Sequence, residues 1–559
     1  MSLERLFQTH TIREQKCLDG IWDFQIIDDV KLPLNYKDTL SVPGCWEMTI
    51  KYGQYIGCAA YRKTINVNEN GNLRLLFKGI SHTGIIYFDG QKVGFHYNAY
   101  TPFSIILPYV TAGKHILEII VDNQFNESSR LHIPNDYYTY GGITRPVFQE
   151  MVPDCYIERS EFVPINDHGS WHAIIKVFVR NCSCQEAEVV IESSCAEATC
   201  TDNIIVAANS EAIAQIILKP ENVRPWNHDN PNLYFLENIL YVSGIPVDDF
   251  IDRVGFRDVS ILNKKILING NPVFLKGVNR HEDHGICGCA IPMQLLDADI
   301  KLIQELGANA VRTSHYPNDE RFLDLCDEKG IFVWEESHDR GGDATRITHP
   351  LFIEQSMKVM HEMMEYHYNH PSIIMWGCLN EAASNCVEGC EVYRMHMNYL
   401  ASDLSRICTY ASNKHGDDMC LEMTDVCSFN IYPYWYGEEN TDELMAVCRR
   451  RMEETGNGSK PIIISEFGGG GIYNFHDVRN VKWSEECQAQ ILEKTITELF
   501  NMEDITGIFI WQYCDTRVSQ GPPKHWPLTR PLSRNNKGLV DEYRRPKMAY
   551  YVVKRLFNS

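Results

Sequence analysis

The segment Ile373-Ile374-Met375-Trp376-Gly377-Cys378-Leu379-Asn380-Glu381 decides how the C-terminal half of the chain is interpreted. A short apolar run bounded by polar residues predicts a fully buried strand, of the kind found in parallel sheets. Glu381 stands where this strand is expected to end, and α/β barrels carry their chemistry at the C-terminal ends of their strands. The alternative is that Glu381 caps the helix that follows, because acidic side chains favour helix N-termini.

A second segment, from Pro461 to Gly468, follows the same pattern: an apolar run, then Glu466, then a glycine-containing loop. By strand count, Glu381 ends the fourth strand of a barrel and Glu466 ends the seventh. These strands face each other across the barrel mouth, so both side chains can converge on one sugar. Two strand-end glutamates are the pair of carboxyl groups that a glycosidase needs.

Composition and charge narrow the classes of function. The chain has 559 residues, too many for one core, with 44% hydrophobic and 23% charged residues, which is ordinary for a globular protein. The net charge of -22 argues against nucleic acid and anionic membrane surfaces as partners. An anionic small substrate remains compatible with this charge if the pocket carries its own cations.

The cysteines and the N-terminus indicate a cellular compartment. The chain has 20 cysteines, scattered and often inside apolar strands, as reduced and buried thiols would be. The pairs Cys182/Cys184 and Cys287/Cys289 are weak evidence for a metal, and we expect none. The N-terminal residues lack the apolar core of a signal peptide, and no stretch of eighteen apolar residues predicts a membrane span. We therefore expect a cytoplasmic protein.

The patterning divides the chain into three domains. Residues 1–153 and 154–257 are rich in short strands and turns, which predicts a β-sandwich followed by an immunoglobulin-like β-sandwich. In residues 258–559, strands alternate with helix-length segments, which predicts a (β/α)8 TIM barrel. The eight predicted strands are Val273–Val278, Ala310–Thr313, Ile331–Glu336, Ile373–Leu379, Ile407–Ala411, Val426–Tyr432, Ile462–Glu466 and Ile508–Tyr513.

Two helical segments of the predicted barrel can be interpreted in detail. Residues 294–306 are apolar at helical spacing, and Gly307 is well placed to end this helix. The predicted helix from Ile353 to Tyr366 carries four methionines, which we interpret as core packing and not as a cofactor site.

Several motifs, met in order along nearly the whole chain, resemble family 2 glycoside hydrolases and, within them, the bacterial β-glucuronidases. The motifs are Ala99-Tyr100-Thr101-Pro102-Phe103, Gly277-Val278-Asn279-Arg280-His281-Glu282-Asp283, Val311-Arg312-Thr313-Ser314-His315-Tyr316-Pro317, Trp376-Gly377-Cys378-Leu379-Asn380-Glu381, Ser465-Glu466-Phe467-Gly468 and the strand ending near Trp511. The resemblance implies a sugar-binding jelly roll for the first sandwich, followed by an immunoglobulin-like sandwich and a barrel.

The resemblance also implies roles for individual residues. Glu381 would be the general acid/base and Glu466 the nucleophile. Further substrate-binding residues implied by the resemblance are Asn380, His281, the paired Tyr432 and Tyr436, Trp511 as the floor under the sugar, Asp136, and the Asn-x-Lys pair Asn535 and Lys537 that would hold a sugar carboxylate. Arg312 and His315 would orient Glu466 or the sugar.

Each of these roles has a structural alternative. Asp136 could be a turn residue before a strand, and Lys537 could be an ordinary solvated lysine. Arg312 and His315 could simply form ion pairs below the barrel mouth, and Trp511 could be a core tryptophan. His281 and His284 invite a metal, but they lie in a predicted loop and not on one helix face, so we favour a sugar contact for His281.

The sequence departs from the family at two places. The segment from His338 to Phe352 is short where some relatives insert a long loop, which predicts an open mouth and an untypical preference for the leaving group. An arginine that some relatives place before Asn-x-Lys has two candidates here, Arg530 and Arg534.

Together these features predict a cofactor-independent, retaining β-glucuronidase. It would cleave small-molecule β-D-glucuronides by double displacement on two glutamates, and we expect a homo-oligomer. The alternatives are another retaining enzyme of the family, a β-galactosidase or β-mannosidase, and a catalytically inactive carbohydrate-binding protein. Hydrolysis rates on a panel of nitrophenyl glycosides distinguish the β-glucuronidase from the first alternative. Absence of hydrolysis of every glycoside at high enzyme concentration would establish the second.

Overall fold

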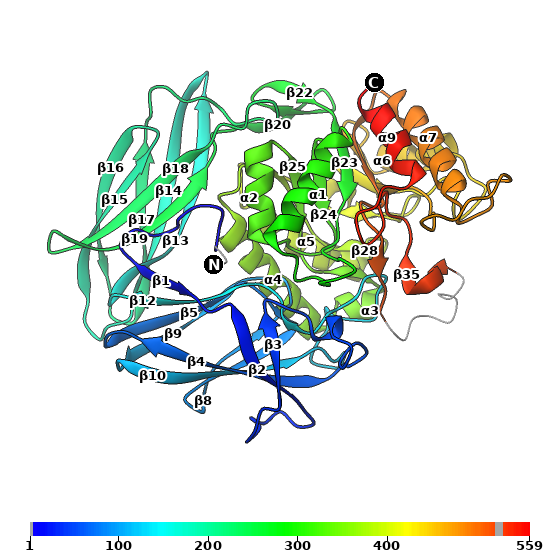
Figure 1. Ribbon diagram of the computed structural model, residues 1–559. Helices are drawn as coiled ribbons and strands as arrows, with labels where there is room; N and C mark the ends of the chain where they lie inside the picture. Colours follow the sequence, from blue (N-terminus) through cyan, green and yellow to red (C-terminus); the bar gives the residue numbers. More distant parts are fainter. Residues whose placement is uncertain (1–3, 520–528) are drawn as a thin grey trace.

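The computed structural model describes residues 4–519 and 529–559. In Figure 1, two β-sandwiches flank a central barrel: the first lies below it in blue and the second to its left in cyan and green. The sequence prediction of two sandwiches followed by a barrel is confirmed.

The first sandwich packs two antiparallel sheets around one apolar core, with Trp22, Phe24 and Leu117 fully buried in it. One sheet contains β1 (Glu14–Cys17), β12 (Val147–Val152), β5 (Gly71–Phe77) and β9 (Phe103–Val110), and the other contains β3 (Asp38–Val42), β2 (Gly20–Ile27), β4 (Cys58–Val67), β10 (Gly113–Asp122), β7 (Thr83–Phe88) and β8 (Gln91–Tyr97). A small pair, β6 (Ile80–Ser81) and β11 (Gly142–Ile143), lies beside them, and η1 spans Trp46–Met48.

The second sandwich has its own core around Ile175, Val177 and Ile191. Alternating buried and exposed residues, as along β17, bury one face of each strand against the facing sheet. Its three-stranded sheet contains β13 (Cys155–Asp167), β14 (Ser170–Asn181) and β17 (Ser210–Leu218), and its four-stranded sheet contains β16 (Ala198–Val206), β15 (Ala187–Cys195), β18 (Tyr234–Val242) and β19 (Ile245–Val254).

The barrel consists of parallel strands that close on themselves. In chain order they are β23 (Leu275–Asn279), β24 (Ala310–Thr313), β25 (Phe332–Glu336), β27 (Ile373–Gly377), β29 (Ile407–Thr409) with β30 (Ala411–Ser412), β31 (Cys427–Asn430), β32 (Ile462–Phe467) and β33 (Ile505–Ile510). The first strand pairs with the last, β23 with β33. A small sheet of β20 (Val259–Leu262), β21 (Lys265–Ile268) and β22 (Asn271–Val273) precedes the barrel and adds Ile266 and Ile268 to the core inside it.

Only the second predicted strand, Ala310–Thr313, has the observed bounds, and four of the others differ in ways that affect the site. The first is split, because Val273 ends β22 and the barrel strand begins only at Leu275. The fifth is interrupted at Tyr410, so that β29 pairs with β27 and β30 with β31. The fourth ends at Gly377 and the eighth at Ile510, so Glu381 and Trp511 lie beyond their strands. The apolar runs continue past the strand ends because the residues there are buried in the barrel mouth.

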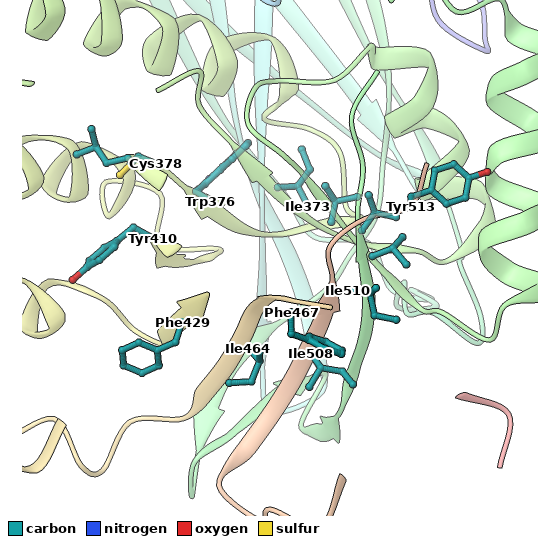
Figure 2. Close-up of a cluster of buried hydrophobic side chains, with 14 of the residues drawn as sticks. Ile373, Trp376, Cys378, Tyr410, Phe429, Ile464, Phe467, Ile508, Ile510 and Tyr513 are labelled. Atoms are coloured by element: carbon teal, nitrogen blue, oxygen red, sulfur yellow. The ribbon is translucent and has the colours of Figure 1, made fainter. Parts of the chain in front are cut away.

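Helices cover the outside of the barrel, and Figure 2 shows the apolar layer beneath them, with Ile464, Ile508 and Ile510 side by side on β32 and β33. The helices are α1 (Met293–Glu305), α2 (Glu320–Lys329), α3 (Ala344–Ile347), α4 (Pro350–His367), α5 (Val387–Leu400), α6 (Thr441–Glu454), α7 (Glu485–Phe500) and α9 (Met548–Phe557), with 3-10 turns η2 (Leu421–Met423) and η3 (Pro531–Ser533). Within the described residues, none of these helices is long and apolar enough to cross a membrane.

Both detailed helix predictions are confirmed. Helix α1 ends before Gly307, whose φ is +83°, and the Gly307 and Ala308 amides donate to the carbonyls of Gln304 and Ile303. This is the hydrogen-bond pattern that a left-handed glycine supports at a helix end. The methionines of α4 pack in or against the main core.

The loop between β10 and β11 of the first sandwich reaches the barrel mouth. Tyr140 donates to the Asp283 carboxylate at 2.8 Å, and Arg145 pairs with Glu282 at 2.8 Å. Both contacts are buried, so the first sandwich is fixed against the loop after the first barrel strand. This junction brings residue 136 to the barrel mouth.

Candidate active site

Glu466 lies in β32 and is 4% exposed at the barrel mouth. Arg312 of β24 donates to its Oε1 at 2.9 Å, and the Tyr432 hydroxyl donates to its Oε2 at 2.7 Å. Arg312 is itself held by Glu336, at 2.6 Å, and by the Asn380 side-chain oxygen, at 2.7 Å. Both oxygens of Glu466 are thus oriented, one by a group on β24 and the other by a group in the loop after β31. Arg312 contacts Glu466 directly, as one of its two predicted roles requires.

Glu381 is carried by a different kind of backbone. It lies in the short strand β28 (Asn380–Ala382), which pairs with β26 (Arg340–Gly342), and its φ is +54°. Its Oε1 accepts from the Asn430 amide at 2.9 Å. The next helix, α5, begins six residues later after the N-cap Cys386, so Glu381 does not cap it. The alternative interpretation of Glu381 as a helix cap is wrong.

Both glutamates line one pocket of about 400 Å³. Its lining residues are Asp136, Arg340, Glu381, Asn413, His415, Asn430, Tyr432, Tyr436, Gly437, Glu439, Leu444, Glu466, Trp511, Arg530 and Lys537. Burial raises the pKa of Glu466 to about 7, and the Glu381 charge adds to this rise, although Arg312 and Tyr432 oppose it. Below about neutral pH one proton is therefore bound to this pair, and burial favours its position on Glu466 in the absence of substrate.

One side of the pocket is cationic. The Lys537 ammonium is 1% exposed and donates to the Tyr436 hydroxyl at 2.7 Å, and it lies 5.5 Å from the centre of the Tyr432 ring. Burial lowers the pKa of Lys537, because water no longer solvates its charge. The interpretation of Lys537 as a solvated surface lysine is therefore wrong.

Asp136 lies at the same side, buried among cations. Its Oδ2 accepts from Arg530 at 2.9 Å and from the Asn535 amide at 3.3 Å, and Arg340 lies 3.4 Å from its Oδ1. Burial alone would raise the pKa of Asp136, but the charges of Arg340 and Arg530 hold it well below its usual range. Of the two candidate arginines, Arg530 lines the pocket, whereas Arg534 pairs with Glu542. Asp136 is not a simple turn residue.

Trp511 forms part of the pocket wall, and its ring stacks on His315 at 5.1 Å between centroids. His315 also bonds through Nδ1 to the Glu336 carboxylate, at 3.0 Å. His281 lies behind this layer: it contacts Trp511 edge-on and bonds to the Tyr316 hydroxyl at 3.1 Å, but it is not among the residues that line the pocket. The predicted sugar contact of His281 therefore stays a prediction, and its ring lies one layer behind the residues that line the pocket.

Several polar atoms around the pocket are buried without a hydrogen-bond partner in the described part of the chain. Among them are Nδ2 of Asn380, Nε2 of His281, Nε2 of His315 and Oδ1 of Asn535. Buried polar groups are normally paired, and an unpaired one costs about 1–3 kcal/mol. A hydroxyl-rich ligand is the kind of molecule that can pair such donors and acceptors.

Sequence reasoning missed Arg340, Glu336 and Asn430. Glu336 ends β25 after an apolar run, as Glu466 follows one, so its signal was present in the sequence. Arg340 lies in the short segment for which we predicted an open mouth. The segment instead folds into β26 and α3, and it brings Arg340 into the pocket. No local pattern marks that inward course, because it depends on pairing with β28.

Two segments of the chain match models of known protein families. Residues 259–558 match "Glycosyl hydrolases family 2, TIM barrel domain", and residues 53–153 match "Glycosyl hydrolases family 2, sugar binding domain". The chain is 31% identical to the β-glucuronidase of Pongo abelii over 98% of this chain and 91% of that one.

Solved structures extend the likeness over the full length. A family 2 β-galacturonidase from Eisenbergiella tayi, bound to galacturonate, is 40% identical with a TM-score of 0.95, over 100% of this chain and 99% of that one. A β-D-glucuronidase from Dictyoglomus thermophilum is 26% identical with a TM-score of 0.84, over 100% and 99% of the two chains. The barrel match alone spans more than half of the 559 residues, and so the chain belongs to glycosyl hydrolase family 2.

Proposed function

We propose that this glycoside hydrolase is a retaining β-D-uronidase, which releases a terminal uronic acid from an alcohol. The observation that carries the proposal is the composition of one pocket: two carboxylates, Glu381 and Glu466, face a wall that holds Lys537, Arg530 and Arg340. The carboxylates suit glycosidic bond cleavage. Among the cations, Lys537 has no carboxylate partner in the described residues, so it is free to bind a sugar carboxylate.

The two glutamates would act in sequence. The reactive form has the shared proton on Glu381 and a negative charge on Glu466, a form that Arg312 and Tyr432 stabilise by donating to both Glu466 oxygens. Glu466 attacks the anomeric carbon while Glu381 protonates the leaving oxygen, which gives a glycosyl ester and an alcohol. Glu381, now ionised, deprotonates a water that attacks the same carbon and releases Glu466. Two inversions retain the β configuration.

Proton NMR during hydrolysis of a nitrophenyl uronide tests this mechanism. The β-anomer of the free uronic acid should appear first and then mutarotate. An initial α-anomer would overturn the double displacement.

The uronic acid itself has two candidates that differ only at C4. The sequence predicts glucuronate, and the glucuronidases described above favour it. Galacturonate is favoured by the Eisenbergiella tayi structure, which is 40% identical over the whole chain. Hydrolysis of the 4-nitrophenyl β-D-glucuronide, galacturonide, glucoside and galactoside, measured side by side with Glu466→Gln as the inactive control, decides between them. Faster cleavage of the neutral sugars would overturn the uronidase proposal.

Two further predictions from the sequence complete the proposal. We expect a homo-oligomer, which light scattering measures, and a cytoplasmic location, which fractionation of the producing cell measures.

A further inference from the structure

The pocket extends beyond the catalytic pair and the cationic wall. Its remaining lining residues come from the loops after β30 and β31 and from α6, and they are Asn413, His415, Gly437, Glu439 and Leu444. None of these five residues has a place in the mechanism proposed above.

A chain of contacts places His415, and with it the nearby Asn413, on the side of the leaving group. His415 Nε2 lies 2.7 Å from the Asn430 carbonyl oxygen, and the Asn430 amide donates to Glu381 at 2.9 Å. Glu381 is the residue that would protonate the leaving oxygen. Lys537, in contrast, bonds to Tyr436, and Asp136 is held by Arg530. The pocket therefore has one end for the sugar acid and another, beside His415, for the group that departs.

The hydrogen-bonding groups at this second end are available to a ligand. A carbonyl oxygen only accepts, so His415 Nε2 carries the hydrogen and Nδ1 of the neutral ring is an acceptor. The Glu439 carboxylate and the Asn413 side-chain NH₂ have no hydrogen bond to any described residue, while Asn413 Oδ1 accepts from Lys414 at 2.8 Å. His415, Glu439 and Asn413 thus offer two acceptors and one donor to the same pocket, which Leu444 also lines.

We infer that Asn413, His415 and Glu439 form a leaving-group subsite for a hydroxylated aglycone, and that the substrates are uronosyl saccharides. Sugar hydroxyls both donate and accept, and so they match this set of two acceptors and one donor. A flat apolar aglycone satisfies none of the three groups and displaces the water that hydrates them. The inference rests on the proposed uronidase function.

The test compares two uronides of the preferred uronic acid with alkyl leaving groups of the same shape. One is β-linked to O6 of methyl glucoside, and the other is the cyclohexylmethyl uronide, which keeps the ring and the methylene bridge without the hydroxyls. We expect kcat/KM to be about tenfold higher for the saccharide, since two or three modest hydrogen bonds together contribute that factor. Equal or faster cleavage of the cyclohexylmethyl uronide would overturn the inference.

A matched pair of variants locates the preference. Glu439→Ala should lower the saccharide-to-cyclohexylmethyl ratio of kcat/KM by about threefold, as the loss of one exposed hydrogen bond does. Glu438→Ala removes the same charge from the neighbouring exposed residue, which does not line the pocket, and should leave the ratio unchanged. An equal change in both variants would refute a specific subsite. If neither uronide is cleaved at all, the proposed function falls as well, and the two failures are thereby distinguished.

Discussion

The two catalytic candidates lie on backbone segments that differ in how many neighbouring strands support them. Glu466 lies within β32, a strand paired on both sides in the barrel, and both of its oxygens are held, one by Arg312 of β24 and the other by Tyr432 just after β31. Glu381 lies in a three-residue strand whose one partner within residues 4–519 and 529–559 is β26, and there a single hydrogen bond, from Asn430, holds its carboxylate. The barrel thus fixes one carboxylate, and a two-stranded ribbon presents the other.

This difference fits two different tasks. A nucleophile must approach one carbon in line, and a misplacement of about 1 Å costs roughly a hundredfold in rate. A general acid/base must serve first a leaving oxygen and then a water, so partial exposure suits it. Because β26 also carries Arg340, the ribbon couples the position of Glu381 to the rim of the sugar site. The barrel strand β32 holds the nucleophile candidate Glu466, and the β26–β28 ribbon links Glu381 to the residues that would bind the sugar.

The largest expected effect separates the two glutamates directly. Glu466→Ala and Glu381→Ala should each lower kcat/KM for nitrophenyl uronides, Glu466→Ala by roughly 10⁴-fold or more, as loss of a nucleophile does. Azide, a small anion that fits the space left by a carboxylate, tells their roles apart. It should give a β-uronosyl azide with Glu381→Ala and an α-uronosyl azide with Glu466→Ala. Products of the opposite configurations would exchange the two roles.

The second effect concerns the cationic wall. Lys537→Ala should lower kcat/KM for uronides by about 30- to 4000-fold, which corresponds to about 2–5 kcal/mol for a truncated buried charge contact. Any slow cleavage of the matching glucoside or galactoside should change little, because these sugars have no carboxylate. An equal loss on all substrates would show that Lys537 is needed for the structure of the pocket and not for recognition.

The same division explains how much of the molecule could be predicted from its sequence. The order of the domains and the strands of the barrel were predictable because buried parallel strands are continuous apolar runs, as at Ile462–Ile464. Glu466 was predictable for the same reason, since it follows such a run in the same strand. The Asn-x-Lys pair was found through family resemblance, which fixes spacing but not geometry.

The parts that failed depend on long-range pairing. The sequence does not reveal that the chain leaves β27 at Gly377 and forms a new strand at Asn380, because that strand exists only through β26. The placement of Arg340 follows from the same pairing. His281 shows what a motif leaves open: its motif is at the mouth, but Trp511 and Tyr316 contact its ring, and it does not itself line the pocket.

A moderate effect tests the ribbon. Arg340→Met removes a charge that lies 3.4 Å from Asp136, while Arg530 remains, so we expect about a tenfold loss of kcat/KM on uronides, as for one charged hydrogen bond. Arg340→Lys should restore part of this loss. Arg534→Met, whose arginine pairs with Glu542 outside the pocket, serves as the control and should retain full activity. A similar loss in the control would indicate a general effect of removing a paired arginine and not a role of Arg340 in the pocket.

The smallest effect is a shift in pH dependence, and it tests the electrostatic coupling between Glu466 of β32 and Glu381 of the β26–β28 ribbon. The pKa of Glu466 is raised to about 7 by burial and by the charge of Glu381, so the one-proton form of the pair is lost above about pH 7, and kcat/KM should fall there. In Glu381→Gln, assayed with a dinitrophenyl uronide that needs no acid, this basic limb should disappear. What remains should be an acid limb below pH 7, because Glu466 alone must be ionised and the neighbouring charge that raised its pKa is gone. A basic limb that persists near pH 7 in this variant would mean that another group titrates, and that the two carboxylates act without the proton they are proposed to share.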